Sequence, residues 1–550
     1  MSRVRGQRRT RPWKVAIITA FVASSIGAVT ADSTGVAAVS CTTQVNDTVA
    51  KLVPCITQRD LWNHMIKFQQ IANANLGPDG HPSRNSGEPG YKASVDYVAQ
   101  KMTEAGYNVT IQTYTFPYFA FTAIPTFSQS SPTAKTFVLN DEFTAGSAAG
   151  TVTGGTVKAA GGIIIPPTPA PSSASGCTAA DFTGIAGRVA LVQRGTCTFG
   201  TKALNAQAAG ATGIIIFNEG NPGRTDAFSG ILIDAAGNTV VPIIPVMFTS
   251  FGIGSTMFTQ ANSATPPVVS IDVKGVSRLN EPDYNVIAES KGGDSNHVVV
   301  VDAHLDAIFG AGMLDNASGS ATILDIAQQM KNVTPRNKLR FIWFGGEELG
   351  LLGSTFYVNN LSSNDLSHIG YDLDADVTAT PNYAIGVLDP AAGDLFGRQV
   401  ISTFPNRVYK SSTVARDQAI AYFDSVGLNH ELFSPDGTDA FSFNQAGIPA
   451  SGLLTGQDCC KLASDVALFG GTTGNFEGNV PSTDGGCVDN PFRWCDNLSN
   501  NDPKVLTFMS KAFATMVVQM AFDTKVMSAS NNSVIKTKAA PHTPRGKLAA

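Results

Sequence analysis

Apolar positions recur at helical spacing in the first part of the chain. Within residues 94–104, the apolar side chains of Val95, Val98 and Met102 are three or four residues apart, which places them on one face of a helix. A glycine then interrupts the pattern, and the stretch NVTIQTYTF over residues 108–116 alternates between apolar and polar positions. This order predicts a helix followed directly by a strand.

Two long apolar runs follow in the second half, and another helical pattern separates them. The run VVVVDAHLD over residues 298–306 and the run LRFIWFGG over residues 339–346 are typical of strands that are buried on both faces of a sheet. Between them, residues 317–331 place Ile323 and Ile326 on one helix face. Strands that alternate with helices predict an α/β domain, a layered mixed sheet with helices on both faces. In such sheets the functional residues gather at the carboxyl ends of the strands.

The middle of the chain has a different pattern. From about residue 133 to 175, Ala, Gly, Pro, Ser and Thr dominate, which indicates a boundary or a long surface loop. Residues 176–274 then contain three short β-type runs, RVALVQRG, GIIIFNE and VPIIPVMF, and one helical stretch, TKALNAQAAGA. We therefore expect a smaller β-rich unit inserted into the α/β domain.

The inserted unit resembles a protease-associated domain in the segments GRVALVQRGTCTF, KALNAQAAGATGIIIFN and PVMF. The alternative is a generic small β domain. We expect the insert over residues 141–275, the α/β domain over residues 32–140 and 276–523, and a disordered, basic tail over residues 524–550. The resemblance implies that the insert restricts access to a site or contacts a substrate or another protein, and that it supplies no catalytic group.

Composition and charge limit the possible partners. The chain has 550 residues, of which 43% are hydrophobic and 15% are charged. A chain of this length and composition is far larger than a single small hydrophobic core requires, so at least two folded units are expected. The formal net charge of −5 gives no overall basic field of the kind that nucleic acids or anionic membranes attract. We therefore expect no nucleic-acid partner.

The N-terminus has the pattern of an export signal. Basic side chains between Arg3 and Lys14 precede an apolar run over residues 15–29, and Ala31 offers a cleavage site. A membrane anchor is the alternative, but the run is shorter than the roughly 20 residues that span a bilayer. We expect residues 1–31 to be removed as a signal peptide and the mature chain to be secreted or periplasmic, with no membrane contact.

Eight cysteines fit an oxidising destination. They form local clusters without a CxxC pair, so disulfides are favoured over structural zinc. Cys459 and Cys460 are adjacent, and we assign them no partners. Sequence proximity favours three pairs: Cys41 with Cys55, Cys177 with Cys197, and Cys487 with Cys495.

Imidazole and carboxylate side chains lie where the predicted strands end. His304 and Asp306 close the first run, Asp315 precedes a helix, and Glu347 and Glu348 follow the second run. These are the ligand types of catalytic zinc sites that keep one position open for water. A lone buried histidine is more often a core residue, but buried carboxylates without a cation are costly. The combination therefore favours a metal site.

The two adjacent glutamates can divide two tasks. Neighbouring side chains point in different directions, so one of them would bind a metal ion and the other would act as a general base. The alternative is that GGEELG only opens a surface helix, where acidic residues favour the helix dipole. The pattern of the residues does not decide which glutamate has which task.

An ordered series of motifs resembles the co-catalytic zinc aminopeptidase family, which includes secreted bacterial leucine aminopeptidases and the aminopeptidase Y type. The motifs run from Ser86 to Gly456 around the insert: SGEPGYKASVDYVAQKMTEAGYNV, NVIAESKGG, AHLDA, MLDNASGSATILDIA, FIWFGGEELGLLGSTFYV, DADVTATPNY and TDAFSFNQAGIPASGLLTG. An ordered series of this length is far more specific than any single motif.

The resemblance implies a role for each site residue. His304 and Asp376 would hold one zinc ion, Asp315 would bridge two ions, Glu348 would bind the second ion, and Glu347 would be the base. Asp306 would orient His304 through the other ring nitrogen. The choice of Asp376 over Asp372 and Asp374 rests on the resemblance.

One departure from the family concerns the second ion. The family takes its last ligand from a Tyr-His pair between two cysteines, and the segment CVDNPFRWCDNLSN has neither residue between Cys487 and Cys495. Asp489 is a candidate substitute. We therefore expect up to two zinc ions, the second held weakly.

These features predict an exported, zinc-dependent aminopeptidase that hydrolyses the N-terminal bond of peptides or proteins. Two alternatives remain at this point. One is a catalytically degenerate homologue that binds peptides, and the other is different metal-dependent amide chemistry on the same scaffold, such as glutaminyl cyclisation or carboxypeptidase action.

Overall fold

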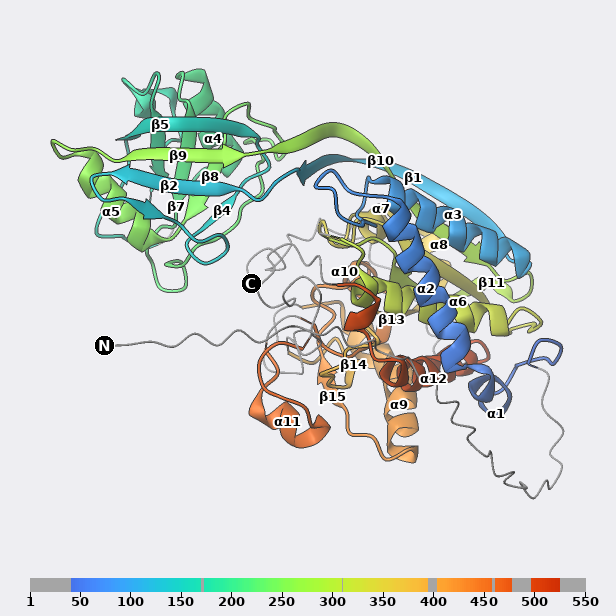
Figure 1. The fold of residues 1–550 in the computed structure, drawn as a ribbon. Helices are drawn as coiled ribbons and strands as arrows, with labels where there is room; N and C mark the ends of the chain where they lie inside the picture. The colour runs from blue at the N-terminus through green and yellow to red at the C-terminus, as the bar shows by residue number, and fades with distance from the viewer. Residues whose placement is uncertain are drawn as a thin grey trace, which may run out of the picture. The chain divides into compact units, whose positions relative to one another are not determined.

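Two eight-stranded sheets organise the residues that the computed structural model describes (Figure 1). The described residues are 41–169, 173–308, 310–393, 403–457, 460–476 and 496–524. The expected signal peptide, the tail beyond Thr524 and the segment 477–495 lie outside them. None of the described helices is long and apolar enough to cross a membrane.

The first sheet is mixed, with the strand order β1-β10-β12-β11-β13-β16-β14-β15. Strands β12, β11, β13 and β16 are parallel neighbours, whereas β1 and β10 pair antiparallel. The carboxyl ends of the parallel strands therefore meet at one edge of the sheet. The strands are β1 (Asn108–Phe121), β10 (Gly275–Glu289), β11 (Asp294–His304), β12 (Asn337–Phe344), β13 (Ile369–Ala375), β14 (Gly386–Leu388), β15 (Glu431–Phe433) and β16 (Ala450–Leu454).

Helices pack on both faces of this sheet, and the predicted fold class is confirmed. Val299 and Val301 of β11 belong to the apolar cluster on one face, and Val298 and Val300 to the cluster on the other. Adjacent strand residues point to opposite faces, so the continuous valine run is buried on both sides. The first cluster includes α2 (Gln58–Ala74), α3 (Pro89–Glu104), α6 (Ser318–Gln329), α9 (Asn406–Ser425) and α12 (Pro503–Met520). The second includes α7 (Leu352–Asn360), α8 (Ser363–His368) and α10 (Ala440–Gln445).

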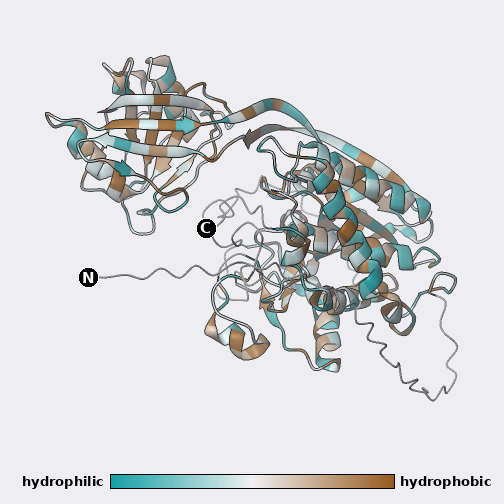
Figure 2. Ribbon diagram, viewed as in Figure 1, coloured by the Kyte–Doolittle hydropathy of each residue, from teal (hydrophilic) through white to brown (hydrophobic). Residues whose placement is uncertain are grey.

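Helix α2 illustrates how the sequence selects a buried face. Leu61, Met65 and Phe68 are fully buried at helical spacing, and Figure 2 shows hydrophobic and hydrophilic segments alternating along the helix. The hydroxyl of Thr57 accepts a hydrogen bond from the N–H of Asp60 at 3.2 Å, which caps the helix. The remaining helical segments are α1 (Val49–Leu52), α11 (Ala463–Phe469) and single turns at Val53–Cys55, Met313–Ala317 and Leu498–Asn500.

The second sheet forms the insert, with the order β3-β2-β9-β5-β6-β7-β8-β4. The three predicted β runs and the helical stretch between the first two of them are present as β6, β7, β8 and α4. Its strands are β2 (Thr126–Ser131), β3 (Lys135–Thr136), β4 (Phe143–Ala145), β5 (Gly150–Ala159), β6 (Val189–Gln193), β7 (Gly213–Phe217), β8 (Val246–Thr249) and β9 (Val268–Val273). Its helical segments are a single turn at Ala179–Phe182, α4 (Phe199–Ala208) and α5 (Phe251–Ala261).

Two features of the insert differ from the sequence expectation. The sheet begins with β2 at Thr126, before the expected boundary at residue 141, because β2 pairs antiparallel with β9. Part of the segment expected to be a boundary or loop is strand β5. Its small and polar residues hide the pattern, but Val152 and Val157 are buried in the core of the insert.

Disulfides fix the start of the described chain and the insert. Cys41 pairs with Cys55, and Cys177 pairs with Cys197, as predicted. Cys460 is also disulfide-bonded. The predicted pair of Cys487 with Cys495 lies outside the described residues.

Candidate metal centre

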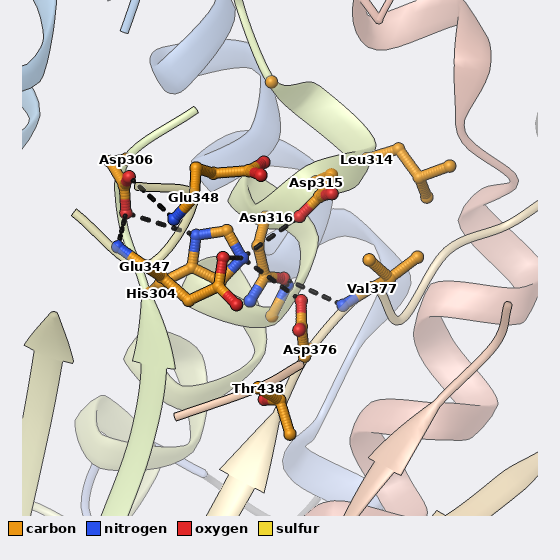
Figure 3. Close-up of polar contacts among 12 residues, drawn as sticks. His304, Asp306, Leu314, Asp315, Asn316, Glu347, Glu348, Asp376, Val377 and Thr438 are labelled. Atoms are coloured by element: carbon orange, nitrogen blue, oxygen red, sulfur yellow. Dashed lines mark hydrogen bonds and ion pairs between the residues drawn. The ribbon is translucent and has the colours of Figure 1, made fainter. Parts of the chain in front are cut away.

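Two neighbouring strands end at a buried cluster of possible metal ligands. His304 is the last residue of β11, and Asp376 directly follows β13, the strand beside it. The Nε2 atom of His304 lies 3.0 Å from an oxygen of Asp315 and 3.2 Å from an oxygen of Asp376 (Figure 3). The ligand atoms of these three buried residues all lie within 4.8 Å of one another. A single ion could therefore contact all three.

Asn316 connects the loop of Asp315 to the end of β13. Its Oδ1 accepts the N–H of Gly319 at 2.7 Å and the N–H of Val377 at 3.0 Å, and its Nδ2 donates to the carbonyl of Ala375 at 2.9 Å. Val377, the neighbour of Asp376, has a φ of 56°, which a β-branched residue rarely adopts. The side chain of Asn316 thus holds both ligand-bearing segments together.

Asp306 lies beside His304 on the side opposite the cluster. Its carboxylate lies 3.3 Å from Nδ1 of His304. It also accepts the backbone N–H of Glu347 at 3.2 Å and of Glu348 at 3.4 Å (Figure 3). Histidines that bind metals commonly have a carboxylate at the ring nitrogen that faces away from the ion. The same carboxylate positions the start of the Glu347-Glu348 segment.

The two glutamates are buried beside the cluster and open no helix. They follow β12 through two glycines, and α7 begins only at Leu352, so the alternative that GGEELG opens a surface helix is wrong. An oxygen of Glu347 lies 3.8 Å from Nε2 of His304. Glu348 extends differently, with its carboxylate toward the side of Asp315 (Figure 3). Different directions of the two side chains allow different tasks.

Negative charge around His304 fits the binding of a cation. Burial by itself lowers the pKa of the His304 imidazole, but the carboxylates of Glu347 and Asp376 outweigh it and raise this pKa well above its usual value. Several buried carboxylates in one place are costly without a positive charge to offset them. Imidazole and carboxylate donors are those of catalytic zinc sites, so the residues present fit a zinc ion.

Only one of the three aspartates on β13 and after it lies beside His304. Asp372, Asp374 and Asp376 alternate and share one face of the sheet. Asp374 accepts hydrogen bonds from the hydroxyl of Thr438 and the N–H of Ala440, and burial raises its pKa to about 7. Asp372 is fully buried further along the strand, and burial raises its pKa well above the usual range. The position of Asp376 is therefore the one from which a carboxylate reaches the cluster.

Within the described ranges, the three-residue cluster is the one group that meets the geometric requirement for holding an ion. Glu348 is adjacent to it but outside it. Asp489, the candidate substitute for the family's last ligand, lies outside the described residues.

Comparison with known proteins gives two family matches. The chain matches peptidase family M28 over residues 285–516 and the PA domain over residues 154–257. An aminopeptidase of Pseudomonas aeruginosa is 35% identical over 480 residues, which is 86% of this chain and 82% of that protein. Leucine aminopeptidase 2 of Trichophyton rubrum is 33% identical over 309 residues, 54% of this chain and 57% of that protein.

Solved structures give the same fold. The aminopeptidase from Aneurinibacillus sp. strain AM-1 superposes with a TM-score of 0.58 at 20% identity, covering 87% of this chain and 97% of that one. A zinc aminopeptidase from Bacillus subtilis has a TM-score of 0.50 at 22% identity, covering 84% of this chain and 95% of that one. The expected sheet with its inserted β-rich unit is thus a known architecture.

Proposed function

The chain belongs to peptidase family M28, carries an inserted PA domain and is a metal-dependent aminopeptidase, and we propose that its native ion is zinc, held chiefly by His304, Asp315 and Asp376. The observation that carries this proposal is the approach of two carboxylates to Nε2 of His304, at 3.0 and 3.2 Å. Three protein ligands and one open position are the usual set of a catalytic zinc site.

Asp306 and Asn316 position the side chains that would bind the ion. Asp306 holds the proton-bearing nitrogen of His304, so the imidazole offers the lone pair of Nε2 to the ion. Asn316 ties the loop of Asp315 to the strand end that carries Asp376. Zinc in this position would act as a Lewis acid toward the scissile carbonyl and the attacking water.

Glu347 is the general base of the proposed reaction. Its carboxylate lies 3.8 Å from Nε2 of His304 and is buried, so it stands next to the place where a water would attack. Glu347 accepts a proton from the attacking water and passes it to the leaving amine, which contributes roughly 10² to 10⁴ in rate. The products are a free amino acid and a shortened peptide.

Glu348 would help to hold a second, weaker ion. Asp315 and Glu348 are two identifiable ligands for it, one fewer than catalytic zinc normally has. The segment between Cys487 and Cys495 offers neither histidine nor tyrosine. We therefore propose that the second site is filled only when zinc is added, and that activity rises as it fills.

Export completes the proposal. The basic and apolar pattern of residues 1–31 and the disulfides Cys41–Cys55 and Cys177–Cys197 fit an oxidising, extracytoplasmic location. There the PA domain would restrict which peptides or proteins reach the site, or contact a partner.

The test combines metal analysis with hydrolysis. The purified mature chain is dialysed, its zinc is counted, and its rate is measured on leucine p-nitroanilide with and without added zinc. We expect about one tightly held ion and a rate that increases with zinc. Two tightly held ions would mean a ligand that we have not identified, with Asp489 the first to substitute. A chain that binds zinc but hydrolyses neither this amide nor a free peptide from its N-terminus would contradict the proposal.

A further inference from the structure

Asp496 accepts hydrogen bonds from the backbone of the loop that carries Asp315. One oxygen of its carboxylate accepts the N–H of Leu314 at 2.8 Å, and the other accepts the N–H of Asp315 at 3.1 Å. The main-chain carbonyl of Asp496 accepts the N–H of Met313 at 3.2 Å. Three consecutive residues are thus bound by one aspartate, which is almost fully buried.

Arg84 binds the same loop through its carbonyl groups. Its guanidinium donates to the carbonyls of Ala311 at 3.3 Å and Gly312 at 3.2 Å, and to the carbonyl of Leu305 at 2.7 Å, next to His304. Burial lowers the pKa of Arg84 to about 10, and the negative charge of Asp496 opposes this effect. The two charges therefore stabilise each other and hold the loop from both its N–H and its carbonyl groups.

We infer that Asp496 is a positioning residue that fixes the backbone of Asp315 so that its carboxylate faces Nε2 of His304. The inference rests on the metal-binding role proposed for Asp315. A carboxylate suits this task because it has two acceptor oxygens for two consecutive N–H donors, and charge-assisted hydrogen bonds are stronger than neutral ones. Asn500 donates to the same carboxylate at 3.3 Å and orients it.

The sequence gives a matched control six residues away. Asp502 also accepts two backbone N–H groups, those of Lys504 at 2.7 Å and Val505 at 3.3 Å, but it does so at the start of α12. The variants Asp496→Asn and Asp502→Asn both remove one negative charge. Only Asp496→Asn also removes an acceptor oxygen from a backbone N–H group, that of the loop of Asp315, because Asp502 accepts both of its N–H groups with the same oxygen, which asparagine keeps.

The experiment measures zinc affinity of the full chain by competition with a chelator. Asp496→Asn should bind zinc about 10- to 100-fold more weakly, the usual effect of losing a group that orients a ligand, whereas Asp502→Asn should stay within about twofold of wild type. The absorption spectrum of the cobalt-substituted chain should change in the first variant only. In the metal-free chain, amide exchange of a peptide that covers residues 313–315 should be faster in Asp496→Asn.

Each result of this experiment either supports or overturns the role of Asp496 as a positioning residue. Unchanged zinc affinity in a folded Asp496→Asn chain would overturn it, as would an equal loss in Asp502→Asn. If Asp496→Asn does not fold, Asn500→Ala is measured instead, because it keeps the carboxylate and removes only its orientation. A loss of about threefold or more supports the inference, and wild-type affinity overturns it. A wild-type chain that binds no zinc at all would instead overturn the proposed function.

Discussion

The carboxylate of Asp306 lies 3.3 Å from Nδ1 of His304, on the side of the ring that faces away from the proposed ion. The same carboxylate accepts the N–H groups of both glutamates. One side chain therefore contacts both the proposed ligand His304 and the backbone of the proposed base Glu347.

Asp306→Asn should impair metal binding and turnover together. The amide keeps one acceptor oxygen, so it cannot serve His304 and both backbone N–H groups at once. We expect zinc affinity to fall about 10- to 100-fold, with a further loss of turnover at saturating zinc because Glu347 is displaced. Chelator competition and kinetics at high zinc separate the two effects, and a variant with normal affinity would show that Asp306 does not orient His304.

Glu347→Gln should leave the metal and the fold nearly unchanged. The substitution keeps the size of the side chain and removes only the group that transfers the proton, so turnover should fall by at least about 100-fold. Zinc content and thermal unfolding are measured alongside the rate. Glu104→Gln, at the exposed end of α3, is the matched control and should keep full activity. Full activity of Glu347→Gln would remove this residue from the role of base.

His304→Ala should lose the metal itself, because a ligand is removed from the cluster. Zinc per chain after dialysis should fall well below that of the wild type. His297→Ala is the control: it lies on the same strand, is partly exposed, and its imidazole is 3.1 Å from Asp294. Zinc retention in His304→Ala, or equal loss in the control, would show that the ligand assignment is wrong.

Because the carboxyl of Asp325 is buried, we expect the free energy of unfolding to depend on pH, independently of the metal site. Burial raises its pKa to about 7, and a hydrogen bond from Gln329 at 3.3 Å only partly opposes this. Below about pH 4 the carboxyl is protonated in the folded and the unfolded chain alike. As the pH rises to 7, only the unfolded chain loses this proton, so the folded chain loses up to about 4 kcal/mol of stability.

Asp325→Asn should therefore be more stable than the wild type at pH 8, and the difference should vanish near pH 4. Urea unfolding at a series of pH values measures it. Asp424→Asn, an exposed aspartate, is the control and should leave the pH profile unchanged. If Asp325→Asn changed the free energy of unfolding by the same amount at every pH, the carboxyl of Asp325 would have the same pKa in the folded and the unfolded chain.

Removal of the insert tests where the catalytic groups reside. Phe121 of β1 and Gly275 of β10 are paired neighbours, so an Asn-Gly turn can join the two strands as a hairpin. We expect the shortened chain to keep its zinc and its rate on leucine p-nitroanilide, and to change its rates on longer peptides. Complete loss of zinc from a folded shortened chain would show that the insert contributes to the site.

The strands that carry the site were predictable, whereas some contacts between its residues were not. The continuous apolar runs before His304 and Glu347 identify buried strands, because few other elements are apolar on both faces. The alternation of Asp372, Asp374 and Asp376 places all three on one face, so periodicity cannot select the residue nearest the sheet edge. Only the family resemblance pointed to Asp376.

Some residues act on backbone groups that are far away in the sequence, and no local sequence pattern identifies them. Asp496 is separated from Asp315 by 181 positions, and no pattern near either residue indicates the contact. Asn316 directly follows Asp315, and that adjacency was the available hint, but its bond to Val377 spans 61 positions. The boundary of the insert was placed late for a related reason, since β2 is recognisable only by its pairing with β9.

The paired strands at the base of the insert have a consequence for the order of folding. The insert is continuous in sequence, while the catalytic domain is interrupted by it, so the insert can fold as a unit during synthesis before β10 emerges. Its folding brings β2 beside β9, with Thr126 opposite Asp272, and so delivers Phe121 next to Gly275. The α/β domain then does not have to lose the conformational entropy of closing a disordered loop over residues 122–274. That loss would cost on the order of 4 kcal/mol of free energy. An insert that folds first can in this way aid the folding of the α/β domain that surrounds it.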